Sequence, residues 1–346
     1  MARARSIASG GALALGAAFA FGATTPLVQR FGRGIGPFTT ASLLYFGSAL
    51  FAVLPAGSRS APLRRTDVPR LLTVSALGAV VAPIALAWGL QRTSGVVASL
   101  LLNLEVLFTV LLARLLWSER IGGRVAAALV ATLAGGALLV IDGRAMSVEA
   151  GWGAFAIVGA TLAWAGDGVI GRPLAERDPS QVVLAKGSLG AVLSLLLSRA
   201  LGEGWPGGPA ALALLACGAV GYGASLRLYL RAQRAVGAAR TGTVFAAAPF
   251  IGASMAWAMG ERAGGIGTLA AAGLCAAGVA LQLTESHAHA HAHEAAEHEH
   301  PHRHDDGHHD HAHHPPVVGE HSHAHRHEPV THEHPHGEDA DHRHEH

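Results

Sequence analysis

The chain has 346 residues; half of them are apolar, 14% are charged and 44 are glycine. Such a composition is typical of membrane proteins and excludes an ordinary soluble globular domain. The formal net charge of +1 hides two opposite parts, because all 23 histidines fall from His287 onward, among many acids. With histidine counted as neutral, residues 1–286 carry +11 and residues 287–346 carry −10.

Ten apolar segments follow one another along residues 7–283. A helix needs about 20 residues to cross the roughly 30 Å hydrocarbon core of a bilayer, and the segments are about this long. The basic, apolar start of the chain also resembles a secretory signal, but the many spans that follow favour an uncleaved first helix. The expected spans run at about Ile7–Val28, Phe38–Leu54, Val68–Leu90, Ser94–Trp117, Gly123–Ile141, Trp152–Ile170, Val182–Leu201, Pro209–Tyr229, Gly237–Met259 and Gly264–Leu283.

The fourth and fifth segments return in the ninth and tenth, after a shift of 142 residues. The shift superposes Gly95 on Gly237, Phe108 on Phe250 and Glu119 on Glu261. The sequence therefore predicts an all-α membrane protein with ten transmembrane helices, five in residues 7–141 and five in residues 151–284. An odd number of spans per repeat makes the two five-helix repeats inverted relative to each other.

Arginines near the span ends are unequally shared between the two sets of loops, fourteen against six. The positive-inside rule then predicts that both termini lie in the cytoplasm of a cell with a bacterial-type inner membrane. The histidine-rich tail, residues 285–346, is cytoplasmic in this topology.

Three stretches carry a family resemblance: Thr93–Glu119 with its Asn103-Leu104-Glu105, GAARTGTVFAAAPFIG at residues 237–252, and LAWAGDGVIGRPLAERDP followed by Lys186-Gly187. They are similar to the EamA-type drug/metabolite transporter superfamily, the third stretch to a bacterial subgroup of it. The resemblance covers residues 7–284 and implies a transporter of small solutes, commonly an exporter. The family often has proline after the Leu-Glu of the fourth helix; Val106 stands there in this chain, so the usual cause of a kink is missing.

Ionisable side chains within a span are costly in lipid, so each one is a candidate functional residue. Glu105 lies 11 residues after Ser94, about 16 Å along a helix and close to the bilayer midplane. A carboxyl shielded from water at that depth has the chemistry that proton coupling requires. The alternative is a structural carboxyl whose partner is Asn103 or a neighbouring helix.

Asp167 and Lys186 are further substrate or coupling candidates, about a turn inside the cytoplasmic ends of the sixth and seventh spans. They could pair across these helices in a structural role, or Lys186 could extend its side chain to the surface. Tyr222 could line a cavity or anchor a helix at the membrane interface.

The tail alternates histidine with alanine, acids and proline, and it is too polar to build a core, so we expect it to be disordered. Neutral imidazole binds zinc, nickel, cobalt and copper, and the repetitive spacing favours several exchangeable sites over one fixed site. The expected ligands in the first part of the tail are His287, His289, His291, His293, His298, His300, His302 and His304.

Several activities are excluded by the sequence itself. The spans contain no histidine for a Ser-His dyad, and no Walker-type loop is present for ATP-driven transport. We therefore expect no enzyme activity, no required cofactor and no nucleic-acid partner.

The sequence thus predicts a secondary transporter that moves a small metabolite across the inner membrane, outward and coupled to protons, with the bilayer and a small-molecule substrate as its partners. A divalent transition-metal transporter is the first alternative, and a membrane-anchored metal buffer or sensor is the second. The oligomeric state stays open, with a homodimer as one alternative.

Overall fold

The computed structural model describes residues 2–54, 61–117, 122–141, 147–261 and 265–283, together with four short strands in the tail. Residues Met1–Glu285 form one compact unit and residues Ser286–Gly337 form another. The two units are described separately.

The first unit is built from helices that follow the ten expected spans. In the first repeat these are α1 (Ala2–Phe31), α2 (Pro37–Ala52), η1 (Arg65–Asp67) with α3 (Val68–Ser75), η2 (Ala76–Val81) and α4 (Ala82–Leu90), then α5 (Gly95–Leu101) with α6 (Leu104–Trp117), and α7 (Gly123–Ile141). In the second repeat they are α8 (Val148–Gly171) with η3 (Arg172–Glu176), α9 (Pro179–Ala200), α10 (Gly208–Cys217) with η4 (Gly218–Ala224) and α11 (Ser225–Val236), then α12 (Ala238–Phe245) with α13 (Ala248–Ala258), and α14 (Ile266–Leu283).

The described helices are apolar along their length, as spans in a bilayer must be. Among the described residues, six helical segments are both long and apolar enough to cross a membrane, and Gly123–Leu139 and Ile266–Leu281 are shorter apolar helices. Large apolar side chains such as Leu115 and Leu269 are exposed on the protein, where they meet lipid. The prediction of an all-α protein with ten spans is confirmed for these residues.

Small residues bring the helices together. A Cβ on Gly187 of α9 would lie 2.8 Å from the backbone nitrogen of Ala49 in α2, and Ala41 and Ala191 are buried on the same two helices. In lipid, where apolar burial does not drive association, such close backbone approach provides the packing contacts that hold helices together.

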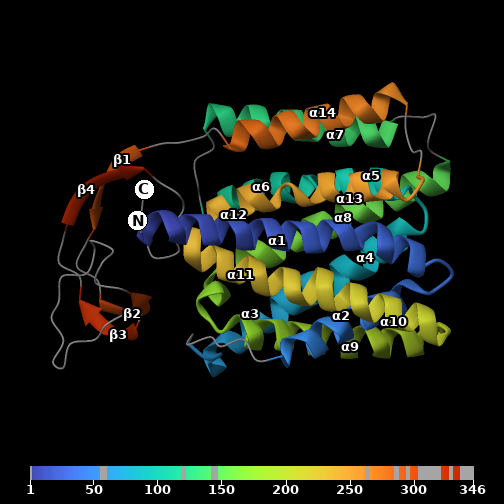
Figure 1. Ribbon diagram of the computed structural model, residues 1–346, viewed down its shortest axis with the longest axis horizontal. Coiled ribbons are helices and arrows are strands. Elements are labelled where there is room, and N and C mark those ends of the chain that lie inside the picture. Colours follow the sequence, from blue (N-terminus) through green and yellow to red (C-terminus); the bar gives the residue numbers. More distant parts are fainter. Residues whose placement is uncertain are drawn as a thin grey trace. The chain divides into compact units, whose positions relative to one another are not determined.

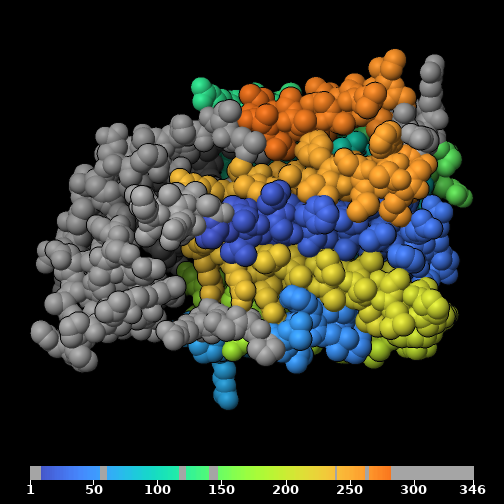
Figure 2. Space-filling view, viewed as in Figure 1, coloured from blue at the N-terminus to red at the C-terminus, as the bar shows by residue number. Residues whose placement is uncertain are grey.

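The packing follows the inverted repeat. Equivalent helices of the two repeats pack against each other as α2 with α9 and α7 with α14, and the α7–α14 pair lies along one edge of the bundle in Figure 1. Between the repeats, α1 packs on α11 as α8 packs on α4, and α1 packs on α13 as α8 packs on α6. Figure 2 shows one result: the side chains of α1 form a band between those of α11 and those of α12 and α13.

The loops repeat the same symmetry. At one end of α2, the Glu203 carboxylate accepts hydrogen bonds from the backbone nitrogens of Phe38 and Thr39, at 3.3 and 2.7 Å, and packs against Gly36. The 142-residue shift maps Gly36 onto Asp178 and Ala61 onto Glu203, and the Asp178 nitrogen donates to the Ala61 carbonyl at 2.8 Å. The repeat symmetry thus brings together two equivalent pairs of residues, Gly36 with Glu203 and Asp178 with Ala61, through different bonds.

Two spans contain a π-helical turn, η2 in the third span and η4 in the eighth. Their first residues, Ala76 and Gly218, are separated by the same 142 residues that relate the repeats. π-Helical turns insert an extra residue into an α-helix and occur frequently at functional sites.

The described residues of the second unit form four strands: β1 (Ala288–His293), β2 (Glu297–His302), β3 (His321–Arg326) and β4 (Val330–Pro335). β1 pairs antiparallel with β4 and β2 with β3, in two separate two-stranded sheets. The tail composition that predicts disorder is too polar to add a packed core to these strands. A backbone ladder needs no apolar core, but a two-stranded sheet alone is only marginally stable in water.

Candidate functional site

The fourth span is broken into α5 and α6 although it contains no proline. Asn103 lies in the break, is 1% exposed, and its side-chain nitrogen donates to the carbonyl of Leu100 at 2.9 Å. The backbone nitrogens of Leu102 and Asn103 bond three residues back, to Ser99 and Leu100. A side chain that competes for backbone carbonyls in this way tightens and interrupts a helix, which explains a break that Val106 gave no reason to expect.

The ninth span is interrupted near the equivalent place, between α12 and α13, two residues further along after the 142-residue shift. Here Pro249 is the second residue of α13 and has no backbone N–H to donate. In secondary transporters, discontinuous helices of this kind surround the substrate and coupling-ion sites, because the ends of the half-helices leave polar backbone groups free to bind.

Glu105 stands two residues after Asn103, in the first turn of α6. Its side chain is partly exposed, and no hydrogen bond or ion pair to its carboxylate occurs among the described residues. It interacts electrostatically with Asp167 and Tyr229. Asn103 does not bond to this carboxylate, because its side-chain nitrogen donates to the Leu100 carbonyl instead.

Asp167 on α8 and Lys186 on α9 form the pair that the sequence allowed. The Lys186 ammonium donates to the two carboxylate oxygens of Asp167 at 2.7 and 2.6 Å. Lys186 is 6% exposed, so its side chain does not extend to the surface. The two charges are opposite and close, which offsets much of the cost of burying each one.

The pair lies against the π-helical turn η2. A Cβ on Gly78 would overlap the Asp167 carboxylate, so only glycine fits there. The Gly78 carbonyl accepts hydrogen bonds from the Tyr45 hydroxyl and from Trp164 Nε1, the latter at 3.1 Å. The Gly78 carbonyl of the third span therefore connects side chains of α2 and α8.

Aromatic rings continue from this point toward the second repeat. The Tyr222 ring in η4 lies 5.4 Å from Tyr45 and 5.8 Å from Phe21, and Phe21 lies 5.7 Å from Trp164. Phe245, the last residue of α12, lies 5.8 Å from Phe21 and 5.0 Å from Tyr229. Tyr222 is 7% exposed and belongs to this aromatic cluster, not to a membrane interface.

The sequence did not single out Tyr45, Gly78 or Phe21 as site residues. Nothing in the local pattern separates them from ordinary packing residues of an apolar span. The carboxylate of Glu105, the Asp167–Lys186 pair and this aromatic cluster together form the candidate site.

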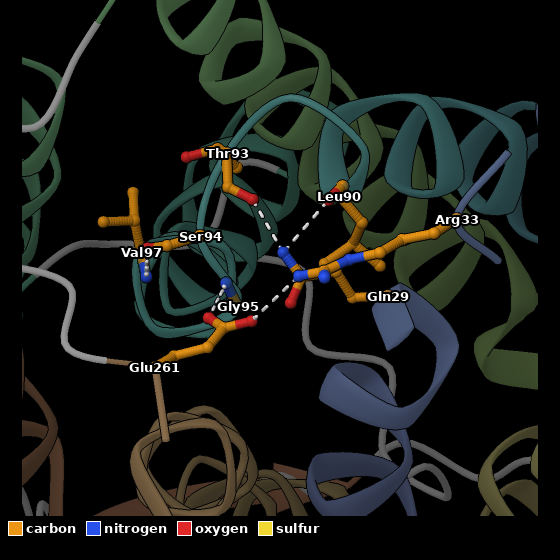
Figure 3. Close-up of polar contacts among 8 residues, drawn as sticks. All are labelled: Gln29, Arg33, Leu90, Thr93, Ser94, Gly95, Val97 and Glu261. Atoms are coloured by element: carbon orange, nitrogen blue, oxygen red, sulfur yellow. Dashed lines mark hydrogen bonds and ion pairs between the residues drawn. The ribbon is translucent and has the colours of Figure 1, made fainter. Parts of the chain in front are cut away.

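A second polar network ties the ends of four spans together, the first, third, fourth and ninth, and Figure 3 shows it. The Glu261 carboxylate, after α13, accepts from the backbone nitrogen of Gly95 at 2.6 Å, and its other oxygen lies 3.9 Å from Arg33 Nη2. The Gln29 amide nitrogen on α1 donates to the carbonyls of Leu90 and Thr93, at 3.1 and 2.8 Å. Ser94 caps α5 by accepting from the Val97 nitrogen at 3.2 Å.

Arg227 has a structural partner at the opposite end of α2. Its guanidinium donates to the carbonyls of Phe51, Ala52 and Leu54, and it is 6% exposed. These are carbonyls that the end of a helix leaves without partners. Arg227 therefore caps α2 in addition to lying near a span end.

The expected tail ligands fall partly within the described strands. His289, His291 and His293 lie in β1, and His298, His300 and His302 in β2; His287 and His304 lie outside the described residues. The backbone register places His289 opposite His334 and His291 opposite His332. In the part of the chain that the structure describes, no group of three His, Cys, Asp or Glu side chains is positioned to hold a metal ion.

Comparison with known proteins agrees with a membrane protein built from two repeats. An uncharacterized transporter of Methanothermobacter thermautotrophicus is 30% identical over 214 residues, 60% of this chain and 62% of that protein, so the chain spans less than two thirds of that relative. A solved crystal structure covers 79% of this chain and 96% of its own, with a TM-score of 0.61 and 21% identity, and so shares the fold. The sequence profile described as the EamA-like transporter family matches residues 8–141 and again residues 151–284. With both repeats matched and ten helical segments in place, this multi-pass membrane protein belongs to the EamA-like transporter family.

Proposed function

We propose that the protein is a secondary transporter that exports a small metabolite across the inner membrane in exchange for protons. The observation that carries this proposal is Glu105: a carboxylate beside a helix break, partly open, with no bonded partner among the described residues. A group of this kind can bind either a proton or a substrate, which is the requirement for coupled exchange.

The Asp167–Lys186 pair and the aromatic cluster complete the proposed site. The pair offers one charge of each sign to a polar solute, and the rings of Tyr222, Phe21 and Phe245 offer apolar and π faces. Binding pockets for small solutes combine apolar walls with a few well-placed polar groups in this way.

The proposed topology has both termini in the cytoplasm. The arginine asymmetry supports it, because basic residues are retained on the cytoplasmic side during insertion. The tail is then proposed to bind transition-metal ions on that side, and the histidines that lie opposite one another in the β1–β4 register support metal binding by the tail.

No specific observation favours transport of a divalent metal by the described spans. Their candidate ligands are the oxygens of Glu105, Asp167 and Asn103, and Asp167 is already bonded to Lys186. An all-oxygen site suits soft transition metals poorly.

The test uses proteoliposomes with an imposed pH gradient and a set of small metabolites. For each compound, a pH dye reports whether its transport dissipates the gradient. With any compound that does so, we expect Glu105→Gln to reduce proton flux by about 100-fold or more, because the amide cannot carry a proton across the cycle. Glu105→Asp should retain part of the flux with a shifted pH profile.

The matched control is Glu149→Gln, which changes an exposed glutamate at the start of α8 in the same way. It should transport like the wild type. Full activity of Glu105→Gln at every pH would contradict proton coupling by this residue.

A further inference from the structure

The two broken spans meet at one end of the bundle, and Glu261 joins them. α13 packs on α5, and Glu261 follows α13 after a turn in which Gly260 has a φ of 94°. Its carboxylate bonds to the backbone nitrogen of Gly95, the first residue of α5. Arg33 follows α1, and its Nη2 atom lies 3.9 Å from the other carboxylate oxygen of Glu261.

We propose that Glu261 is a gating residue: its bond to Gly95 holds one mouth of the transport pathway closed, and this bond must break before that mouth opens. The proposal rests on alternating access by a membrane transporter, but it does not depend on the identity of the solute or of the coupling ion.

Glu261 joins two elements that each lie next to a break in their span. α5 is a half-helix of seven residues, separated from α6 by the break at Leu102 and Asn103, and α13 is separated from α12 by a second break. Each half can tilt without carrying the rest of its span, because a hinge needs only a few residues that change their backbone angles. A contact between two such halves is well placed to control an opening between them.

Side chains from three elements pack tightly around Gly95 in the closed state. A Cβ on Gly95 would lie 2.7 Å from Gln29 Oε1, 3.0 Å from Glu261 Oε2 and 3.2 Å from the Ala256 side chain. Only glycine lets α1, α5 and the end of α13 converge here. Behind this point, Ser99 on α5 is fully buried and faces Gly252 of α13, so separation of α5 from α13 would expose it.

The contact can also be released easily. The Glu261 side chain is 23% exposed, so water can replace its hydrogen bond as the mouth opens. Its ion pair with Arg33 is long at 3.9 Å, and the Arg33 side chain is 70% exposed, so this pair contributes little.

Glu203 provides a control within the same molecule. It too is a glutamate whose carboxylate accepts from backbone nitrogens at a helix start, those of Phe38 and Thr39 in α2. However, α2 and the preceding helix α9 are both unbroken and pack along each other. Glu203 therefore joins two helices that stay packed together, α2 and α9, whereas Glu261 joins two half-helices that can separate, α5 and α13.

The experiment measures the opening without any substrate. In a full-length background with Cys217 and Cys275 changed to alanine, Ser99→Cys provides a reporter thiol behind the gate. A membrane-impermeant, cationic methanethiosulfonate reagent is added to proteoliposomes from the Glu261 side, and the rate of labelling is measured. Loss of one charge-assisted hydrogen bond changes an equilibrium by about tenfold or more, so Glu261→Gln should speed labelling by about that factor. Glu203→Gln should leave the rate unchanged, and Glu261→Asp should give an intermediate rate.

Equal labelling in the parent and in Glu261→Gln would overturn the proposal, as would equal acceleration by Glu261→Gln and Glu203→Gln. Where Glu261→Gln yields no inserted protein, the comparison is made with Gly95→Ala, which displaces the same carboxylate and should also speed labelling. Because no solute or proton gradient is used, the outcome is independent of the role of Glu105.

Discussion

The Lys186 ammonium bonds to both carboxylate oxygens of Asp167, so that two adjacent spans of the second repeat share a buried bidentate ion pair. The 142-residue shift maps Asp167 onto Thr25 and Lys186 onto Leu44, so the first repeat has no such pair. The two repeats thus share their helices, but this ion pair belongs to the second repeat alone.

Removing one partner of this pair should be much more damaging than removing both. We expect Asp167→Asn or Lys186→Met alone to lower the free energy of unfolding by about 3–5 kcal/mol, because each leaves an uncompensated buried charge. The double variant Asp167→Leu with Lys186→Met should recover most of this stability. Thermal unfolding in detergent measures both changes in stability. Transport by the double variant then separates a structural role of the pair from a role in transport. An active double variant means that the pair is purely structural, and a stable but inactive one means that the pair is used in transport.

Gly78→Ala should disturb the same pair from the other side. The added Cβ would overlap the Asp167 carboxylate, and overpacking of this kind costs about 1–3 kcal/mol of stability. The control is Gly168→Ala, next to Asp167 in sequence, where a Cβ would meet nothing within 4 Å. Equal unfolding temperatures for the two variants would show that the contact between η2 and Asp167 is loose.

The proposed topology makes a definite prediction for reporter fusions. Reporters fused after Pro62 and after Leu283 should both be found on the cytoplasmic side, and a reporter fused after Arg144 should be found on the other side. The arginine distribution is the reason for this expectation. A reporter at residue 144 on the same side as the C-terminus would rule out five spans in the first repeat.

Metal binding by the tail should weaken as the pH falls from about 7.5 to 5.5. Unperturbed imidazole has a pKa of about 6.5 and binds metal only when neutral, so protons displace the metal over this range. Isothermal titration of zinc or nickel into the full-length protein, compared with a variant lacking residues 287–346, measures the effect. Metal binding that is unchanged at pH 5.5, or equal in the two proteins, would contradict binding by the histidines of the tail.

The same truncation tests what the tail does. A tail that only buffers metal predicts unchanged transport of every solute, and a tail that feeds a metal pathway predicts selective loss of metal efflux. A regulatory tail predicts a change in metabolite transport only when metal is added. Transport by both proteins, first without metal and then at micromolar metal, separates these outcomes.

The large-scale features could be predicted from the sequence because they depend on composition and periodicity. The ten spans follow from the length and spacing of the apolar segments. The shift that relates Glu119 to Glu261 and the pairing of Asp167 with Lys186 follow from charged residues, which are costly and rare within lipid. The break at Asn103 could not be predicted, because it depends on which carbonyl one amide side chain selects. The bond from Gly95 to Glu261 could not be predicted either. It joins residues 166 positions apart in the sequence, and the packing of α13 on α5 brings them together.

The π-helical turns at Ala76–Val81 and Gly218–Ala224 change how the third and eighth spans must be read in mutational scans. An inserted residue turns everything after it by about 100° around the helix axis. A single helical wheel drawn through residues 68–90 or 208–236 therefore mixes the inward side of one half with the lipid side of the other. Two wheels, one on each side of the turn, keep the phases correct, and scanning data from these spans should show tolerance patterns that shift phase at residues 76–81 and 218–224.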